Sequence, residues 1–246
     1  MPFASHLAMS IGFFAGIIPA VIIIFMTLKE YDEYYEDKHF FFLLVLGLFA
    51  GTMTALIYYW SIIYLGQNLS LLTLPLIIVG FAIYEILLFT IVLSMKRFGG
   101  KYDLTYYGVV FGGSIGAVLN MFNIFLYLRN YNLTSQAILS MVFMVPTLPL
   151  LYISIGALVG FGLVKERFLK YSAWAFILKS IFNGIFIFWF IAFLFWPPER
   201  GWDLMVLGLL FAFCLYLYVS REHLPGSLPE HLQKHRRRQK RKQKRK

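Results

Sequence analysis

Long apolar stretches, separated by short polar segments, dominate the pattern of the chain. An apolar stretch of about 20 residues can cross the roughly 30 Å hydrocarbon layer of a membrane as a helix. Inside lipid the backbone must satisfy its own hydrogen bonds, so such stretches are helical. We expect seven of them, at about 7–28, 40–65, 70–95, 105–128, 135–163, 171–197 and 202–219. The pattern therefore predicts an all-α, polytopic transmembrane bundle.

Composition agrees with this interpretation. Hydrophobic residues make up 60% of the chain and charged residues only 14%, whereas about a quarter of the residues of a soluble domain are charged. The first apolar stretch follows no segment rich in Lys or Arg and is long for a cleavable signal peptide. We therefore expect it to be a genuine span. The fifth contains Pro146 and Pro149 and should be kinked or broken there.

Lys and Arg are distributed unevenly between the predicted loops. The segments 29–39, 96–104 and 164–170 carry two, three and three of them, whereas the alternate loops carry none, one and one. The segment 234–246 carries ten more. Because cytoplasmic loops are enriched in Lys and Arg, we expect the N-terminus outside and the C-terminus in the cytoplasm. The predicted location is the plasma membrane, with the lipid bilayer as the first partner.

The chain divides into an expected transmembrane domain, 1–223, and an expected basic, disordered cytoplasmic tail, 224–246. Blocks of like charge repel themselves and bind polyanions. Anionic lipid would gain about 1 kcal/mol per basic residue, and RNA or a ribosome would be bound through its phosphates. A topology signal without a ligand is the third interpretation. The candidate polyanion-binding residues are Arg236, Arg237, Arg238, Lys240, Arg241, Lys242, Lys244, Arg245 and Lys246.

Small residues recur at every fourth position in three of the predicted spans. Such ridges let helix backbones approach closely in lipid. We interpret them as packing surfaces within the bundle, with a homodimer face as the alternative. The glycines concerned are Gly47, Gly51, Gly108, Gly112, Gly116, Gly156 and Gly160.

Two ionisable residues, Glu85 and Lys179, are expected deep within spans. At 1.5 Å per residue they lie roughly 15 Å and 12 Å from the cytoplasmic ends of their helices. Asn183 is one turn beyond Lys179, so the three can share one layer. Asn120 and Asn123 complete the candidate buried polar site. It is either an ion pair that fixes how two helices meet, or a catalytic or transport site.

The predicted spans lack the residues that several classes of intramembrane enzyme need. We expect no histidine within a span, whereas a rhomboid-like protease needs an embedded serine and histidine. A presenilin-like protease needs two embedded aspartates, and here Asp103 and Asp203 are placed at span edges. A zinc site needs three or four converging ligands, and Glu85 alone cannot supply them. We therefore expect no metal ion and no cofactor.

Polar motifs in the first half of the chain follow one another in a definite order. An acidic segment at 29–38 joins the first two apolar stretches. Tyr84 and Glu85 lie in the second half of the third. A tyrosine-containing segment at 101–108 then leads into the glycine-rich stretch 112–117.

The order continues with Phe122-Asn123 and Tyr127, and then with Lys179 and Asn183 in the sixth stretch. In this order the chain resembles the PrsW-type intramembrane metalloproteases over about residues 15–190. In that family a Glu-Glu-x-x-Lys helix corresponds to the third stretch. A Glu-Asn pair before a tyrosine corresponds to the fourth, and a His-x-x-x-Asn motif to the sixth.

The chain departs from the family pattern at several positions. At the positions of Tyr84, Phe122 and Lys179 the family has Glu, Glu and His, and the histidine expected near Pro149 is absent. Of the residues that would hold a metal or act as acids, only Glu85 remains. The resemblance therefore implies a catalytically inactive relative, in which Lys179 supplies the positive charge that a metal supplies in the family.

The sequence thus predicts a membrane scaffold or a substrate-binding pseudoprotease with a membrane-protein partner. Two alternatives remain open: an active intramembrane peptidase with an unfamiliar site, and a small-solute transporter. The transporter is the less favoured alternative, because the spans contain few polar groups and no inverted repeat is detectable.

Overall fold

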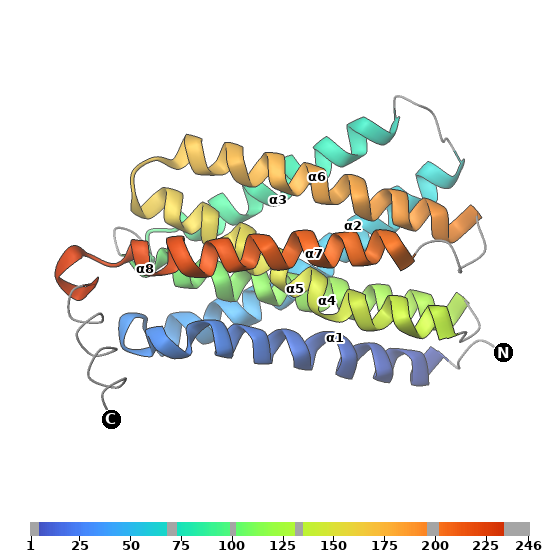
Figure 1. The fold of residues 1–246 in the computed structure, drawn as a ribbon, viewed down its shortest axis with the longest axis horizontal. Coiled ribbons are helices and arrows are strands. Elements are labelled where there is room, and N and C mark those ends of the chain that lie inside the picture. Colours follow the sequence, from blue (N-terminus) through green and yellow to red (C-terminus); the bar gives the residue numbers. More distant parts are fainter. Residues whose placement is uncertain (1–4, 68–72, 99–101, 131–134, 196–201, 234–246) are drawn as a thin grey trace.

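The computed structural model describes residues 5–67, 73–98, 102–130, 135–195 and 202–233, and every regular element in these ranges is helical (Figure 1). Seven helices are long and apolar enough to cross a membrane, which makes the chain a multi-pass membrane protein. They are α1 (Ser5–Leu28), α2 (Asp37–Gln67), α3 (Thr73–Leu93), α4 (Leu104–Asn130), α5 (Ser135–Val164), α6 (Phe168–Phe195) and α7 (Trp202–Tyr218). The prediction of seven spans is confirmed.

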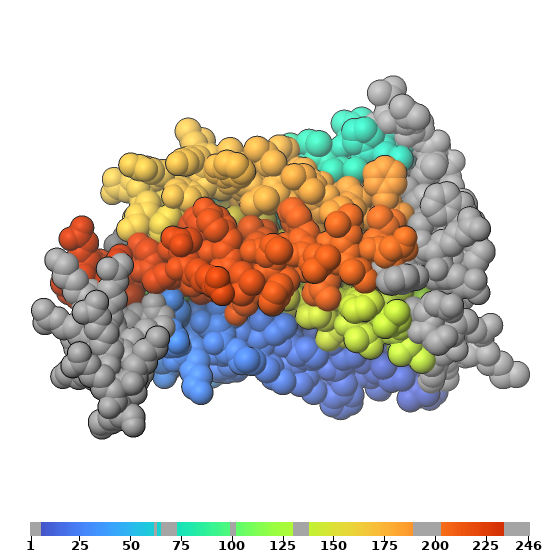
Figure 2. Space-filling model, in the orientation of Figure 1, coloured from blue at the N-terminus to red at the C-terminus, as the bar shows by residue number. Residues whose placement is uncertain are grey.

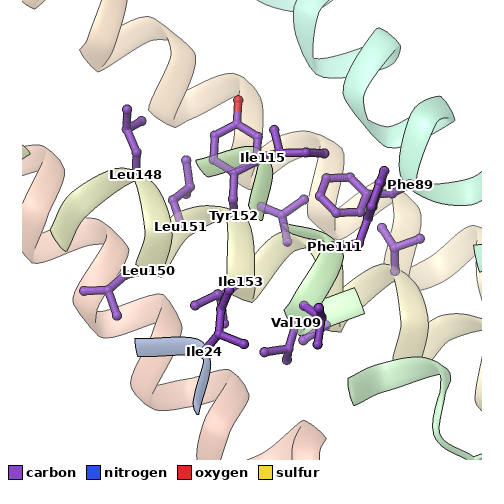
Figure 3. Close-up of a cluster of buried hydrophobic side chains, with 14 of the residues drawn as sticks. Ile24, Phe89, Val109, Phe111, Ile115, Leu148, Leu150, Leu151, Tyr152 and Ile153 are labelled. Carbon is purple, nitrogen blue, oxygen red and sulfur yellow. The ribbon is translucent and has the colours of Figure 1, made fainter. Parts of the chain in front are cut away.

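The helices α4 and α5 form the centre of the bundle and are its most buried spans. The helices α1 and α2 pack against α4, α6 and α7 pack against α5, and α3 packs mainly against α6. In the apolar core, Ile24 of α1 lies beside Ile153 of α5, and Phe111 of α4 packs against Phe89 of α3 (Figure 3). The outer helices turn large apolar side chains such as Met26 and Leu76 outward, as expected of surfaces in contact with lipid.

Close backbone contact between α4 and α5 depends on glycine. A Cβ atom at Gly108 would overlap the carbonyl oxygen of Gly156, and one at Gly112 would overlap the carbonyl oxygen of Tyr152. In α2, a Cβ at Gly47 would likewise lie 2.6 Å from the Cβ of Ser114 in α4. These glycines therefore pack helices of one chain against each other, as the first interpretation of the ridges predicts.

The helix α5 contains both Pro146 and Pro149 and continues past them to Val164, so it is not broken there. A proline removes the hydrogen bond to the carbonyl four residues earlier, which for Pro149 is that of Val145. The side-chain amide of Asn120 in α4 donates to this carbonyl oxygen at 2.8 Å. A neighbouring helix thus replaces the missing donor, as membrane helices require.

The packed structure continues beyond residue 223. A π-helical turn, η3 (Val219–His223), and a short helix, α8 (Leu224–Ser227), extend α7. Ser227 is buried and donates to the hydroxyl of Tyr106, which donates to the carbonyl of Leu224. The expectation that spans contain no histidine is wrong. His223 lies within the candidate span Asp203–Ser227, His39 lies within Asp37–Ser61, and His6 begins the first candidate span.

Candidate functional site

The buried polar site is centred on an ion pair between Glu85 of α3 and Lys179 of α6. The Nζ atom of Lys179 lies 2.9 Å from Oε2 of Glu85. Both residues are 1% exposed. A charge inside a membrane span is costly unless it is paired or solvated, so each residue supplies the partner that the other needs.

Two tyrosines complete the surroundings of the carboxylate. The hydroxyl of Tyr58, on α2, donates to Oε1 of Glu85 at 2.5 Å. The hydroxyl of Tyr152, on α5, donates to the same oxygen. In Figure 3 the Tyr152 hydroxyl points away from the aliphatic side chains that surround the base of its ring. Hydrogen bonds to an ionised acceptor are the strong ones, and together with the ion pair they join four helices.

Aromatic faces surround the ammonium group of Lys179. Its Nζ atom lies 3.9 Å from the centre of the Tyr152 ring and 5.6 Å from that of Phe182. A cation over an aromatic face gains roughly 2 kcal/mol when it is desolvated. Tyr152 therefore serves both charges, with its hydroxyl on the carboxylate and its ring beneath the ammonium. We call Glu85, Lys179, Tyr58 and Tyr152 the charge cluster.

The structure places the three predicted asparagines differently. Asn183 is buried one turn beyond Lys179, and its amide donates to the carbonyl of Ile78 in α3 at 3.3 Å. It therefore ties the same two helices as the ion pair. Asn120 serves the interrupted α5 helix and does not belong to the charge cluster. Asn123 is half-buried on α4, and no hydrogen bond to the charge cluster is found within the described ranges.

The sequence analysis did not single out Tyr58 and Tyr152. A signal for them existed, because a tyrosine hydroxyl buried in an apolar environment usually finds a hydrogen-bond partner. Every tyrosine within a predicted span is therefore a candidate partner for a buried charge. The sequence could not show which of the sixteen tyrosines in the chain face Glu85.

The acidic segment between α1 and α2 lies apart from the charge cluster. Residues Lys29–Tyr34 form a 3₁₀ helix, in which Tyr31 and Tyr34 are buried. Asp32 and Asp37 are exposed. Tyr35 donates to Asp32 at 3.1 Å, and its partial burial together with the two carboxylates raises its pKa to about 12. The carboxylates therefore belong to a solvated end of the bundle.

Among the described residues, no three His, Cys, Asp or Glu side chains converge as metal ligands would. The nine candidate polyanion-binding residues, from Arg236 to Lys246, lie outside the described ranges. The charge cluster is thus the candidate site that the structure assembles from residues of several helices.

Comparison with known proteins adds no further identification. No protein-family model, no curated protein and no solved structure matches the chain.

Proposed function

We propose that this multi-pass membrane protein is a non-catalytic scaffold, a pseudoprotease of PrsW-like architecture that binds another membrane protein. The observation that supports the proposal is that side chains from three other helices already bind the carboxylate of Glu85. Lys179 occupies one carboxylate oxygen, and two tyrosine hydroxyls occupy the other. A carboxylate bound in this way holds helices together.

A catalytic carboxylate has different requirements. A general base must lie within hydrogen-bond reach of the proton that it abstracts, either directly or through one water molecule. Glu85 is 1% exposed, so a substrate could reach it only if the surrounding helices separated. Separation would also break the ion pair, at a cost of several kcal/mol for each stranded charge. This cost favours a structural role over peptidase activity.

The resemblance to PrsW-type proteases gives the proposal its second part. Lys179 and Asn183 occupy the positions of that family's His-x-x-x-Asn motif. We infer that the ammonium of Lys179 supplies the positive charge beside Glu85 that a metal supplies in active members. We also propose that the protein lies in the plasma membrane, with its N-terminus outside and a cytoplasmic tail that binds anionic lipid or RNA.

The proposal is tested with a variant in which both charges are removed together, Glu85→Gln with Lys179→Met. The carbonyl oxygen of the introduced glutamine would still accept hydrogen bonds from Tyr58 and Tyr152, so we expect this double variant to fold. Partners are captured by crosslinking in intact membranes from cells that express the wild type or the double variant. A scaffold needs the fold and not the charges, so both proteins should capture the same partners.

Three outcomes would contradict the proposal. A folded double variant that captures none of the wild-type partners would show that the charges themselves bind. Cleavage of a membrane-embedded peptide by the wild type in vesicles, abolished by Glu85→Gln, would establish the peptidase. Charge-dependent uptake of a solute into the same vesicles would instead establish the transporter.

A further inference from the structure

A second buried polar group lies at the end of the bundle where α6 begins and α7 ends. There a cavity of about 430 Å³ opens between these two helices, which lie side by side on the face shown in Figure 2. We call it the α6–α7 cleft. Its lining residues are Leu158, Lys170, Tyr171, Trp174, Leu178, Leu215, Tyr218 and His223.

The lining of the cleft changes from polar to apolar along α6. Lys170 lies in the first turn of the helix and is exposed, Trp174 follows one turn later, and Leu178 one turn after that. Leu158 of α5 and Leu215 of α7 continue the apolar wall. The cation would meet the headgroup of a phospholipid, the aromatic ring would lie at the boundary between headgroup and hydrocarbon, and the aliphatic wall would contact the acyl chain.

His223 is the unusual residue of the cleft. The π-helical turn η3 ends at this residue, and such turns occur frequently at functional sites. The imidazole is packed among three aromatic rings, those of Phe161, Tyr171 and Tyr218, at 4.7, 5.6 and 4.9 Å between ring centres. His223 is 5% exposed, and its Nδ1 atom has no hydrogen-bond partner in the described part of the chain.

The outer edge of the cleft faces the membrane. Trp174 and Tyr218, one on each helix, are 54% and 55% exposed, and aromatic residues of this kind concentrate at the boundary between hydrocarbon and headgroups. Exposed charges nearby offset one another: Arg221 and Glu222 lie on the η3 turn, and Glu166 and Arg167 lie in the loop before α6. Lys170, which lines the cleft itself, therefore leaves the net charge at the entrance positive.

We propose that the α6–α7 cleft binds one anionic phospholipid of the leaflet nearest α8, which the charge pattern predicts to be cytoplasmic. The phosphate of the headgroup lies at Lys170, beside the His223 ring. An acyl chain runs inward along Leu158, Leu178 and Leu215. This site differs from the basic segment 234–246, because it recognises the acyl chain of the lipid as well as the negative charge of its headgroup.

The experiment uses the full-length protein in detergent with added lipid, and native mass spectrometry counts the bound lipids. The probes are phosphatidylglycerol, phosphatidylcholine with the same acyl chains, and glycerol 3-phosphate as a soluble phosphate. About 0.5 M salt screens the long-range attraction to the basic segment more than a close contact between Lys170 and a phosphate held in the cleft. Lys170→Gln removes the cation, and Leu178→Phe fills the apolar wall. Lys165→Gln is the matched control, because Lys165 lines a different cavity.

We expect the wild type to retain phosphatidylglycerol in preference to phosphatidylcholine. Lys170→Gln should reduce this preference about fivefold, as expected for one basic residue at a lipid surface. Leu178→Phe should reduce the occupancy of both lipids, and Lys165→Gln should leave both unchanged.

Three results would overturn the proposal. They are a wild type without headgroup preference, equal effects of Lys170→Gln and Lys165→Gln, and competition by glycerol 3-phosphate as strong as that of the lipid. Thermal unfolding of each variant without lipid separates lost binding from a lost fold. Lys170 is exposed, so its variant remains informative even if Leu178→Phe does not fold.

Discussion

Glu85 and His223 are both almost completely buried, yet they differ in the polar partners that surround them. Glu85 has partners on three other helices, namely Tyr58, Tyr152 and Lys179. The Nδ1 atom of His223 has no hydrogen-bond partner within the described ranges, and the ring is held by aromatic neighbours. Glu85 is thus held by an ion pair and two hydrogen bonds, whereas Nδ1 of His223 has neither among the described residues.

The two residues illustrate the difference between a buried group that stabilises the fold and one that is available to a ligand. A buried polar group that keeps its partners specifies how helices meet, and its loss strands those partners. A buried polar group without a partner gains little from its polarity in the folded state. The charge cluster should therefore be sensitive to substitution in stability measurements, and His223 should be sensitive mainly in lipid binding.

The largest expected effect is that of a single neutralisation in the charge cluster. Glu85→Gln or Lys179→Met leaves one charge buried without its counter-ion, and each should lower the free energy of unfolding by about 3–5 kcal/mol. Thermal unfolding of the purified variants in detergent measures the loss. A variant as stable as the wild type would mean that the charge is not needed at that position.

The next effect is expected at Tyr152. Tyr152→Phe keeps the ring beneath Lys179 and removes only the hydroxyl that donates to Glu85. A hydrogen bond to a charged group contributes about 1.5–3 kcal/mol, so the variant should lose an amount in this range. Tyr58→Phe is the matched comparison, and its loss should be similar because its hydroxyl donates to the same carboxylate oxygen. An unchanged stability of Tyr152→Phe would contradict the assignment of its hydroxyl to Glu85.

A smaller or similar loss is expected for Gly112→Ala, because the added Cβ would overlap the Tyr152 carbonyl and separate α4 from α5. Overpacking of this kind costs about 1–3 kcal/mol. Gly184→Ala in α6 is the control, since a Cβ there has no atom within 4 Å. Chemical unfolding of both variants in mixed micelles decides the matter, and equal stabilities would argue against close α4–α5 packing.

The smallest effect is expected at the α6–α7 cleft. His223→Phe keeps an aromatic ring among Phe161, Tyr171 and Tyr218 and removes a nitrogen that has no partner in the described part of the chain. Replacing a polar group by an apolar one of similar shape is nearly neutral, so the loss of stability should be far smaller than that of Glu85→Gln. A loss as large as that of Glu85→Gln would show that His223 is a structural anchor, and the contrast between the two residues would fail.

Most of the fold follows from the sequence, because an apolar stretch in lipid has few alternatives to a helix. The predicted spans 105–128 and 135–163 agree with α4 and α5 to within a few residues. The prolines of α5 were harder to interpret. Whether a helix continues past Pro149 depends on a donor from another helix, here Asn120, and such a contact is invisible in a single sequence.

The candidate site could be predicted only in part. Depth along the helices was enough to bring Glu85 and Lys179 together, because a rise of about 1.5 Å per residue converts position into height. Rotation about each helix axis is set by packing, so the tyrosine partners could not be assigned. His223 was missed because the π-helical turn and its burial come from tertiary contacts at the end of α7.

The most direct test of the account is a double-mutant cycle on Glu85 and Lys179. Thermal unfolding of the wild type, Glu85→Gln, Lys179→Met and the double variant gives the four free energies. The account predicts that the double variant is at least as stable as either single variant, so the coupling energy should equal or exceed one single loss of about 3–5 kcal/mol. Strictly additive losses would show that the two charges do not stabilise each other, and that Glu85 serves another group.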